Sequence, residues 1–264
     1  MIIRSLLRLR PRLIELCCFL IGMGSVAGAQ QTPLPVTTTL QSSLTALSGK
    51  TNVQDITIWG NVTAGPESGT IELRATSAGQ SRIDLNLTNG SKSELRSMSS
   101  DGPSGTWYGA DQIAHPISQH NQLYEAAWFV PNIVIARLMS TSNVVNYLGQ
   151  ETKSKALALH FTGYQQLPAI SNPLATQPKH LSQIDVYLDP STWLPTVVSF
   201  NIHPDSDASV DIPVEIHFSD YKATNGILLP HSIQKYLNNG LVMDIQVQGV
   251  QVNSGVPAQT FTAQ

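Results

Sequence analysis

Apolar residues recur at every second position along much of this chain, and this alternation restricts its fold more than any other feature. Successive side chains of a strand point to opposite faces of a sheet, so the pattern predicts strands with one apolar and one polar face. Turn signals such as Asn89-Gly90 separate the runs and supply the positive φ angles of tight hairpins. The alternating runs occupy residues 56–62, 71–75, 83–87, 157–161, 184–188, 198–202, 212–218, 227–237 and 241–252. The sequence therefore predicts antiparallel strands that form a sheet covered on one side only.

The last run changes parity within itself. Leu241, Met243, Ile245 and Val247 share one parity, whereas Val250 and Val252 have the other. An extra residue in one strand of an antiparallel pair restores the apolar face after such a slip. We therefore expect a β-bulge at Gly249.

Two segments have a helical period instead. Leu40, Leu44 and Leu47 predict a short N-terminal helix, with Gly49 as the residue that ends it. Residues 121–148 carry two apolar helical stripes, and a helix that is apolar on two sides must be buried on two sides. Pro131 within this segment predicts either a kink or a division into two shorter helices.

These patterns together define the expected fold class. It is α+β and mainly β, with a wide, curved antiparallel sheet and helices packed on its apolar, concave face. A sheet with strands of about eleven residues must twist and curl. We expect one domain over residues 37–264.

The first residues resemble an export signal. Four arginines precede an apolar stretch, and Ala27-Gly28-Ala29 matches a small-x-small cleavage site. A membrane anchor is the alternative, but the apolar run is shorter than the roughly 20 residues of a spanning helix. We therefore expect a signal peptide over residues 1–29, cleavage near Ala29-Gln30, a linker over residues 30–36, and a periplasmic or secreted protein.

Cleavage would change the composition in two ways. Both cysteines, Cys17 and Cys18, would be lost, so the mature chain of about 235 residues would need an ordinary packed core rather than disulfides. It would keep 11 basic and 17 acidic residues, a net charge of −6. An acidic, lysine-poor surface argues against nucleic acid and anionic membrane surfaces as partners.

The stretch YLDPSTWLPTVVSF, residues 187–200, has the residue types of a catalytic site but the order of a turn. Asp189-Pro190 between two alternating runs is typical of a type I turn, and we expect Trp193 and Leu194 to begin the next strand. The chain has no G-x-S-x-G, P-loop or G-x-G-x-x-G motif. The seven histidines are scattered without metal-ligand spacing, and an acidic run at Asp205–Asp211 lacks the calcium-loop pattern. The sequence therefore predicts no catalytic residue, no cofactor and no metal site.

The helical segment is the best candidate for a binding site. Its apolar residues are either plain core or the wall of a cavity for an apolar ligand. Arg137 within "IVIARLM" either reaches the surface or pairs with an acid, or it marks the mouth of an apolar groove and meets a polar head. The candidate cavity residues are Trp128, Phe129, Ile133, Ile135, Arg137, Leu138 and Met139.

The second half of the chain resembles a known superfamily of secreted bacterial proteins, the outer-membrane lipoprotein-sorting (Lol carrier-like) superfamily. The resemblance is best over residues 184–252, and its motifs are Leu188-Asp189-Pro190, Leu194-Pro195, Asp220-Tyr221, Asn225-Gly226 and Leu229-Pro230. "ALSGK" and "ITIWGNV" in the first half also fit. The resemblance implies an incomplete β-barrel closed on its inner face by helices. It also implies an interior that binds acyl chains of lipoproteins or lipids, or, in some relatives, a protein partner.

Three functional hypotheses follow. The first is a non-catalytic, monomeric periplasmic protein without a stable membrane anchor, which holds an acyl chain of a lipid or lipoprotein between sheet and helices. The second is a regulatory or scaffold module that binds an envelope protein and has a filled interior. The third is a secreted hydrolase, which would need a Ser/His/Asp or metal cluster assembled only in three dimensions.

Overall fold

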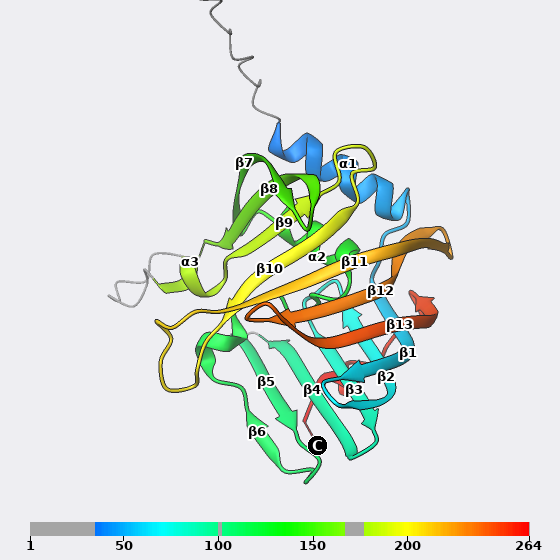
Figure 1. The fold of residues 1–264 in the computed structure, drawn as a ribbon, viewed down its shortest axis with the longest axis vertical. Helices are drawn as coiled ribbons and strands as arrows, with labels where there is room; N and C mark the ends of the chain where they lie inside the picture. Colours follow the sequence, from blue (N-terminus) through cyan, green and yellow to red (C-terminus); the bar gives the residue numbers. More distant parts are fainter. Residues whose placement is uncertain (1–34, 100–101, 167–176, 264) are drawn as a thin grey trace, which may run out of the picture. The chain divides into compact units, whose positions relative to one another are not determined.

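The computed structural model describes residues 35–99, 102–166 and 177–263, and its main element is one antiparallel sheet of 13 strands (Figure 1). In chain order the strands are β1 (Asp55–Ala64), β2 (Glu67–Thr76), β3 (Ser81–Leu87), β4 (Gly90–Ser99), β5 (Gly102–Tyr108), β6 (Ala114–Pro116), β7 (Asn143–Lys153), β8 (Ala156–Gln165), β9 (Ile184–Leu188), β10 (Pro195–Ile202), β11 (Ile212–Thr224), β12 (Ile227–Leu237) and β13 (Gly240–Val252). The alternating runs of the sequence all lie in these strands. The prediction of an antiparallel, mainly β fold is confirmed.

Two meanders make up the sheet, and they meet in its middle. The spatial order runs from β6 through β1, then from β13 back to β7. β1 therefore pairs with the last strand of the chain. β6 and β7 are the two outer strands, so the sheet is not closed into a barrel.

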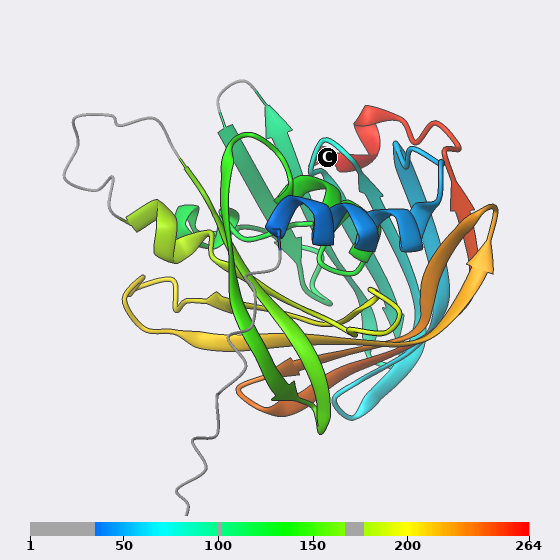
Figure 2. The same cartoon turned by 90° about the horizontal axis from the view of Figure 1, so that it is seen from above.

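The helices are α1 (Val36–Ser48), α2 (Pro131–Leu138) and the short α3 (Gln177–Leu181), with the 3₁₀ turns η1 (Gln119–Gln122) and η3 (Ala258–Phe261). α1 and α2 lie on the concave side of the curved sheet (Figure 2). The segment between β6 and β7 must pass from one outer strand to the other, and it carries η1 and α2 on its way. None of the described helices is long and apolar enough to cross a membrane.

The N-terminal helix agrees with its prediction. α1 ends at Ser48, and Gly49 follows with a φ of 56° while its N–H donates to the carbonyl of Thr45. A glycine at this position adopts a left-handed conformation without steric cost.

The prediction of helices across residues 121–148 is largely wrong. Only Pro131–Leu138 is helical, and residues from Asn143 onward pair with β8 as strand β7. Pro131 starts α2 rather than kinking it, because proline lacks the N–H that a first-turn position leaves unused, and it holds the preceding Val130 in an extended conformation. Residues 123–130 form turns, yet Trp128 and Phe129 within them are fully buried.

The predicted bulge is confirmed. Trp59 of β1 lies opposite Gly249, but its neighbour Gly60 lies opposite Val247, so Gln248 is the extra residue of β13. A Cβ added at Gly249 would lie 2.2 Å from the Trp59 ring. Glycine therefore lets the indole lie flat on the bulged strand.

The Asp189 turn is also confirmed, with one difference. The Asp189 carboxylate accepts hydrogen bonds from the N–H groups of Ser191 and Thr192, and the Trp193 N–H donates to the Asp189 carbonyl. Trp193 has a φ of 64°, so it belongs to the turn, and β10 begins only at Pro195. The turn uses Asp189 as a structural acceptor for backbone N–H groups.

One continuous core fills the space between sheet and helices. Alternate side chains of β1–β3 and β8–β13 contribute most of it, and the connecting segment adds aromatic residues from the other side. The largest fully buried side chains include Trp128, Phe129, Phe161, Leu40, Leu47, Ile56, Ile58, Leu73, Ile133, Ile135 and Leu159.

Candidate functional site

The candidate binding site is a cavity of about 620 Å³ between α1, α2 and the ends of β7, β8 and β9. A volume of this size falls within the usual range of ligand pockets. Its walls come from six separate parts of the chain. The lining residues are Gln41, Leu44, Ser48, Gly49, Lys50, Thr51, Asn52, Val53, Ser77, Leu123, Glu125, Asn132, Ile133, Ala136, Arg137, Leu138, Ser140, Ser142, Asn143, Tyr164, Gln165, Ser182 and Ile184.

The apolar part of the wall is aliphatic. It consists of Leu44, Val53, Leu123, Ile133, Leu138 and Ile184. Four of these, Val53, Ile133, Leu138 and Ile184, are also members of the packed core. This side of the cavity is therefore a face of the core itself, and it suits a hydrocarbon group.

The polar part of the wall contains a partly buried ion pair. Arg137 Nε of α2 donates to Glu125 Oε2 at 2.7 Å, and Glu125 Oε1 accepts the N–H of Ala127 at 3.0 Å. A Cβ at Gly79 would lie 2.4 Å from the Arg137 guanidinium. Glycine at this position therefore lets the β2–β3 turn lie close to the guanidinium. Arg137 therefore pairs with an acid and lines a cavity, and its contact with a polar head group stays a prediction.

Two buried amide oxygens face no hydrogen-bond donor among the described residues. Asn132 Nδ2 donates to Ser48 Oγ at 2.9 Å and Asn143 Nδ2 to the Arg137 carbonyl at 2.7 Å, but neither Oδ1 has a partner. Both asparagines line the cavity. An unmade hydrogen bond of this kind costs about 1–3 kcal/mol, and both oxygens are shielded from solvent, so the two asparagines pack here at a cost to stability.

The seven predicted cavity residues fall in three places. Ile133, Arg137 and Leu138 line the cavity. Met139 lines a smaller neighbouring cavity of about 200 Å³, together with Val36, Leu40 and Val145. Trp128, Phe129 and Ile135 are buried in the core and line neither cavity.

The arrangement around Trp128 explains the difference. Its ring packs edge-on against Phe129 at a centroid distance of 5.3 Å, and the ammonium of Lys235 lies 4.7 Å from the ring centroid. The interior under residues 123–130 is therefore filled. The prediction missed Leu44 and Val53 as wall residues, although the helical spacing of Leu40, Leu44 and Leu47 places Leu44 on an apolar face.

Two polar clusters lie outside the cavity. Ser154 Oγ is 3.5 Å from His217 Nδ1, and His217 Nε2 is 2.8 Å from Glu215 Oε2. These three residues are of the types found in a hydrolase triad. However, Ser154 is a turn residue with a φ of 51°, and Glu215 also forms an ion pair with Lys153. Ser154 and His217 do not line either cavity above.

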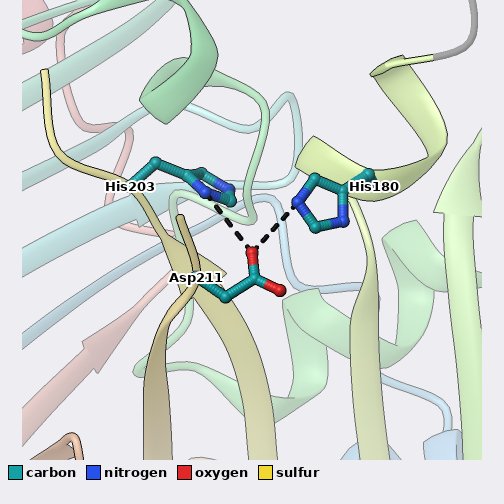
Figure 3. Close-up of side chains that lie close together, drawn as sticks. All are labelled: His180, His203 and Asp211. Atoms are coloured by element: carbon teal, nitrogen blue, oxygen red, sulfur yellow. Dashed lines mark ion pairs between the residues drawn. The ribbon is translucent and has the colours of Figure 1, made fainter. Parts of the chain in front are cut away.

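The other cluster contains metal-ligand side chains. His180, His203 and Asp211 place one ligand atom each within 4.8 Å of one another (Figure 3). No spacing signal in the sequence marks this group: His203 and Asp211 lie in the loop between β10 and β11, whereas His180 lies in α3, before β9 and β10.

Comparison with solved structures decides the fold. The chain superposes on an outer membrane lipoprotein-sorting protein domain from Vibrio parahaemolyticus with a TM-score of 0.51 and 12% identity, over 86% of this chain and 95% of the other. The chain shares the fold of this domain. A DUF1329 family protein from Desulfovibrio piger shares this fold, with a TM-score of 0.52 and 11% identity over 86% of this chain and 97% of the other. The resemblance inferred from the sequence is confirmed at the level of fold.

Comparison of the sequence itself gives no such relative. No protein-family model matches the chain, and no curated protein matches it. The low sequence identity to the two solved structures means that the likeness shows architecture alone. The site must therefore be interpreted from its own residues.

Proposed function

We propose that this chain is a non-catalytic, exported binding protein that holds the acyl chain of a lipid or lipoprotein. The observation that carries the proposal is the cavity between α1, α2 and the ends of β7–β9, with an aliphatic wall on one side and polar side chains, among them Glu125 and Arg137, on the other. An amphipathic guest matches both walls. The export signal of residues 1–29 and its cleavage near Ala29-Gln30 belong to the same proposal.

The two walls suggest how such a guest would lie. The acyl chain would lie along Leu44, Ile133 and Leu138, and each square ångström of apolar surface buried there would contribute about 25 cal/mol. The head group would lie towards Arg137, whose guanidinium donates hydrogen bonds. The lipoprotein-sorting fold supports this proposal as an analogy.

Ala136 offers a way to block the cavity without removing core atoms. It is an exposed residue of α2 that lines the cavity. We expect Ala136→Phe to fill the space beside Leu138 and to lower the affinity for palmitic acid and for a synthetic triacylated lipopeptide at least tenfold. Ala46→Phe on α1 is the matched control, because Ala46 lies on a different surface of that helix.

The measurement is native mass spectrometry of the mature protein purified from a bacterial periplasm, followed by organic extraction and titration with both probes. Co-purified lipid in the wild type and in Ala46→Phe, but not in Ala136→Phe, supports the proposal. A protein that stays free of both probes at saturating concentration refutes it and favours the partner-binding module. Equal binding by both variants would place the acyl chain elsewhere.

A further inference from the structure

Three metal-ligand side chains, one from α3 and two from the loop between β10 and β11, lie close together (Figure 3). His180 belongs to α3, His203 follows β10, and Asp211 directly precedes β11. Asp211 Oδ1 lies 3.0 Å from His180 Nε2 and 3.5 Å from His203 Nδ1. All three ligand atoms lie within 4.8 Å of one another.

The spacing fits a small transition-metal ion. Tetrahedral zinc with bonds of 2.0–2.1 Å to nitrogen and oxygen separates its ligand atoms by about 3.3 Å. The two distances to Asp211 Oδ1 lie on either side of this value. The two imidazole rings are 5.2 Å apart between centroids, and His180 is 45% exposed, so a small rotation of an exposed side chain would complete the geometry.

His203 is held firmly in place before any ion arrives. Its side chain is only 1% exposed. The side-chain amide of Asn121 in η1 forms two hydrogen bonds with the His203 backbone. Asn121 Nδ2 donates to the His203 carbonyl at 2.7 Å, and Asn121 Oδ1 accepts the His203 N–H at 2.9 Å. A buried and anchored imidazole is a preorganised ligand, because little conformational entropy remains to be lost on binding.

The hydrogen bonds of the cluster are of the kind that an ion replaces. His203 Nδ1 lies 3.0 Å from the carbonyl of Val210, to which it donates as the protonated nitrogen. An ion between His203, His180 and Asp211 would displace the protons that these atoms now share. Histidine nitrogen with one carboxylate oxygen suits zinc and its first-row neighbours, and it does not suit calcium or magnesium, which prefer oxygen ligands alone.

A second histidine–carboxylate group in the chain shows the contrast. His160 Nδ1 lies 3.0 Å from Glu151, and His160 Nε2 lies 3.1 Å from Asp185. These carboxylates bond to different nitrogens of one ring, so they diverge around it and cannot share an ion with it. In the His180 cluster both rings bond to one oxygen, and the three groups converge.

We propose that His180, His203 and Asp211 bind a divalent transition-metal ion of the zinc type, with solvent or a further ligand completing its coordination. The ion would fasten α3 to the loop between β10 and β11. The proposal does not depend on the acyl-chain cavity.

The surroundings also indicate how tightly the ion would bind. His180 and Asp211 are each about half exposed, at 45% and 44%. His203 Nε2 is buried and has no hydrogen-bond partner among the described residues. Outer hydrogen-bond partners of metal-ligating histidines contribute about 10–100-fold in affinity. We therefore expect weaker binding than at a closed structural zinc site, with rapid loss to chelators.

The experiment uses the mature protein, stripped with a chelator and titrated with ZnCl₂ by calorimetry, with Co²⁺ absorption as the report on geometry. His180→Gln and Asp211→Asn are the test variants, because both side chains are about half exposed and neither belongs to the packed core. His217→Gln is the matched control, since His217 also lies beside a carboxylate, Glu215 at 2.8 Å. Circular dichroism verifies that every variant is folded.

We expect one equivalent of Zn²⁺ to bind to the wild type and to His217→Gln with affinities within twofold of each other. His180→Gln and Asp211→Asn should each lower that affinity at least tenfold and abolish the tetrahedral Co²⁺ spectrum. An unchanged affinity in both test variants would overturn the assignment, since the ion would then lie elsewhere. Absence of Zn²⁺ binding by the wild type would overturn it as well, and the cluster would be a hydrogen-bonded contact only.

Discussion

The buried guanidinium of Arg96 allows a quantitative test of how much stability comes from the hydrogen bonds between β4 and the segment that connects β6 to β7. Arg96 of β4 is 5% exposed. Its Nε donates to Glu94 Oε1 at 2.7 Å, its Nη1 donates to the carbonyl of Asn121 at 2.8 Å, and its Nη2 donates to the hydroxyl of Tyr124. The side chain therefore joins β4 to η1 and to the turn that follows it.

We expect Arg96→Met to lower the free energy of unfolding by about 3 kcal/mol at pH 7. Methionine keeps the apolar stem but removes hydrogen bonds from a charged donor, each worth about 1.5–3 kcal/mol. It also leaves Glu94 without its closest cation. Because Glu94 is still 30% exposed, water reduces this last penalty below the 3–5 kcal/mol of a fully buried broken pair.

The loss should depend on pH in a defined direction. Burial raises the pKa of the Glu94 carboxyl, but attraction to Arg96 and Lys235 outweighs it, and the pKa lies below its ordinary value. A lowered pKa stabilises the fold above the pKa of the unfolded chain, and that contribution is lost as the pH falls through the folded pKa. Without Arg96 the effect of burial dominates and the pKa rises. Arg96→Met should therefore cost more at pH 7 than at pH 4.

The assay is urea unfolding followed by circular dichroism at both pH values. Arg74→Met is the matched control: Arg74 pairs with Glu72 and Asp84, but these three side chains are 24–40% exposed, so we expect a loss of about 0–1 kcal/mol. The double variant Arg96→Met/Glu94→Gln should recover part of the stability, because it removes the unpaired charge. A loss below 1 kcal/mol in Arg96→Met, or an equal loss at pH 4 and pH 7, would refute the reasoning.

Three further substitutions test packing and turn chemistry by the same unfolding assay. Gly163→Ala should cost about 1–3 kcal/mol, because its Cβ would lie 2.2 Å from Leu138 Cδ1 and push α2 off β8; an unchanged midpoint would contradict this close approach. Trp128→Ala should cost about 3–5 kcal/mol, as expected of a filled core position, and a loss below 1 kcal/mol would show that the ring lines open space. Asp189→Ala should lower the free energy of unfolding by about 1 kcal/mol at pH 7 and by less at pH 3. The hydrogen bond from the Ser191 hydroxyl, with those from backbone N–H groups, lowers the pKa of Asp189, so the stabilisation by its carboxylate decreases as the pH falls. A loss that is equal at both pH values would contradict this role.

The sequence by itself determined the local structure of nine of the 13 strands, and it missed β4, β5, β6 and β7, which carry no clear alternation of apolar residues. Strand faces, the Asn-Gly turns, the Asp189 turn and the bulge before Gly249 all follow from side-chain parity and backbone chemistry within a few residues. The same local rules located α1 and its end at Gly49. They failed at residues 121–148, because a helix and a buried irregular turn can place apolar side chains at similar spacings. Only Pro131 and the β-branched residues of β7 distinguish the helical part of this segment from its turns and its strand.

Only the tertiary structure decided which residues meet. The pairing of β1 with β13 brings residues nearly 200 positions apart into one register, and no local pattern encodes it. Burial alone could not distinguish Ile133 and Leu138, which face a cavity, from Trp128 and Ile135, which fill the core, since all four are apolar and buried. The convergence of His180, His203 and Asp211 has the same origin. The position of an apolar or ligand-type residue in the local pattern predicts the face of the strand or helix on which it lies. Which residues it contacts in space depends on how distant strands and helices pack.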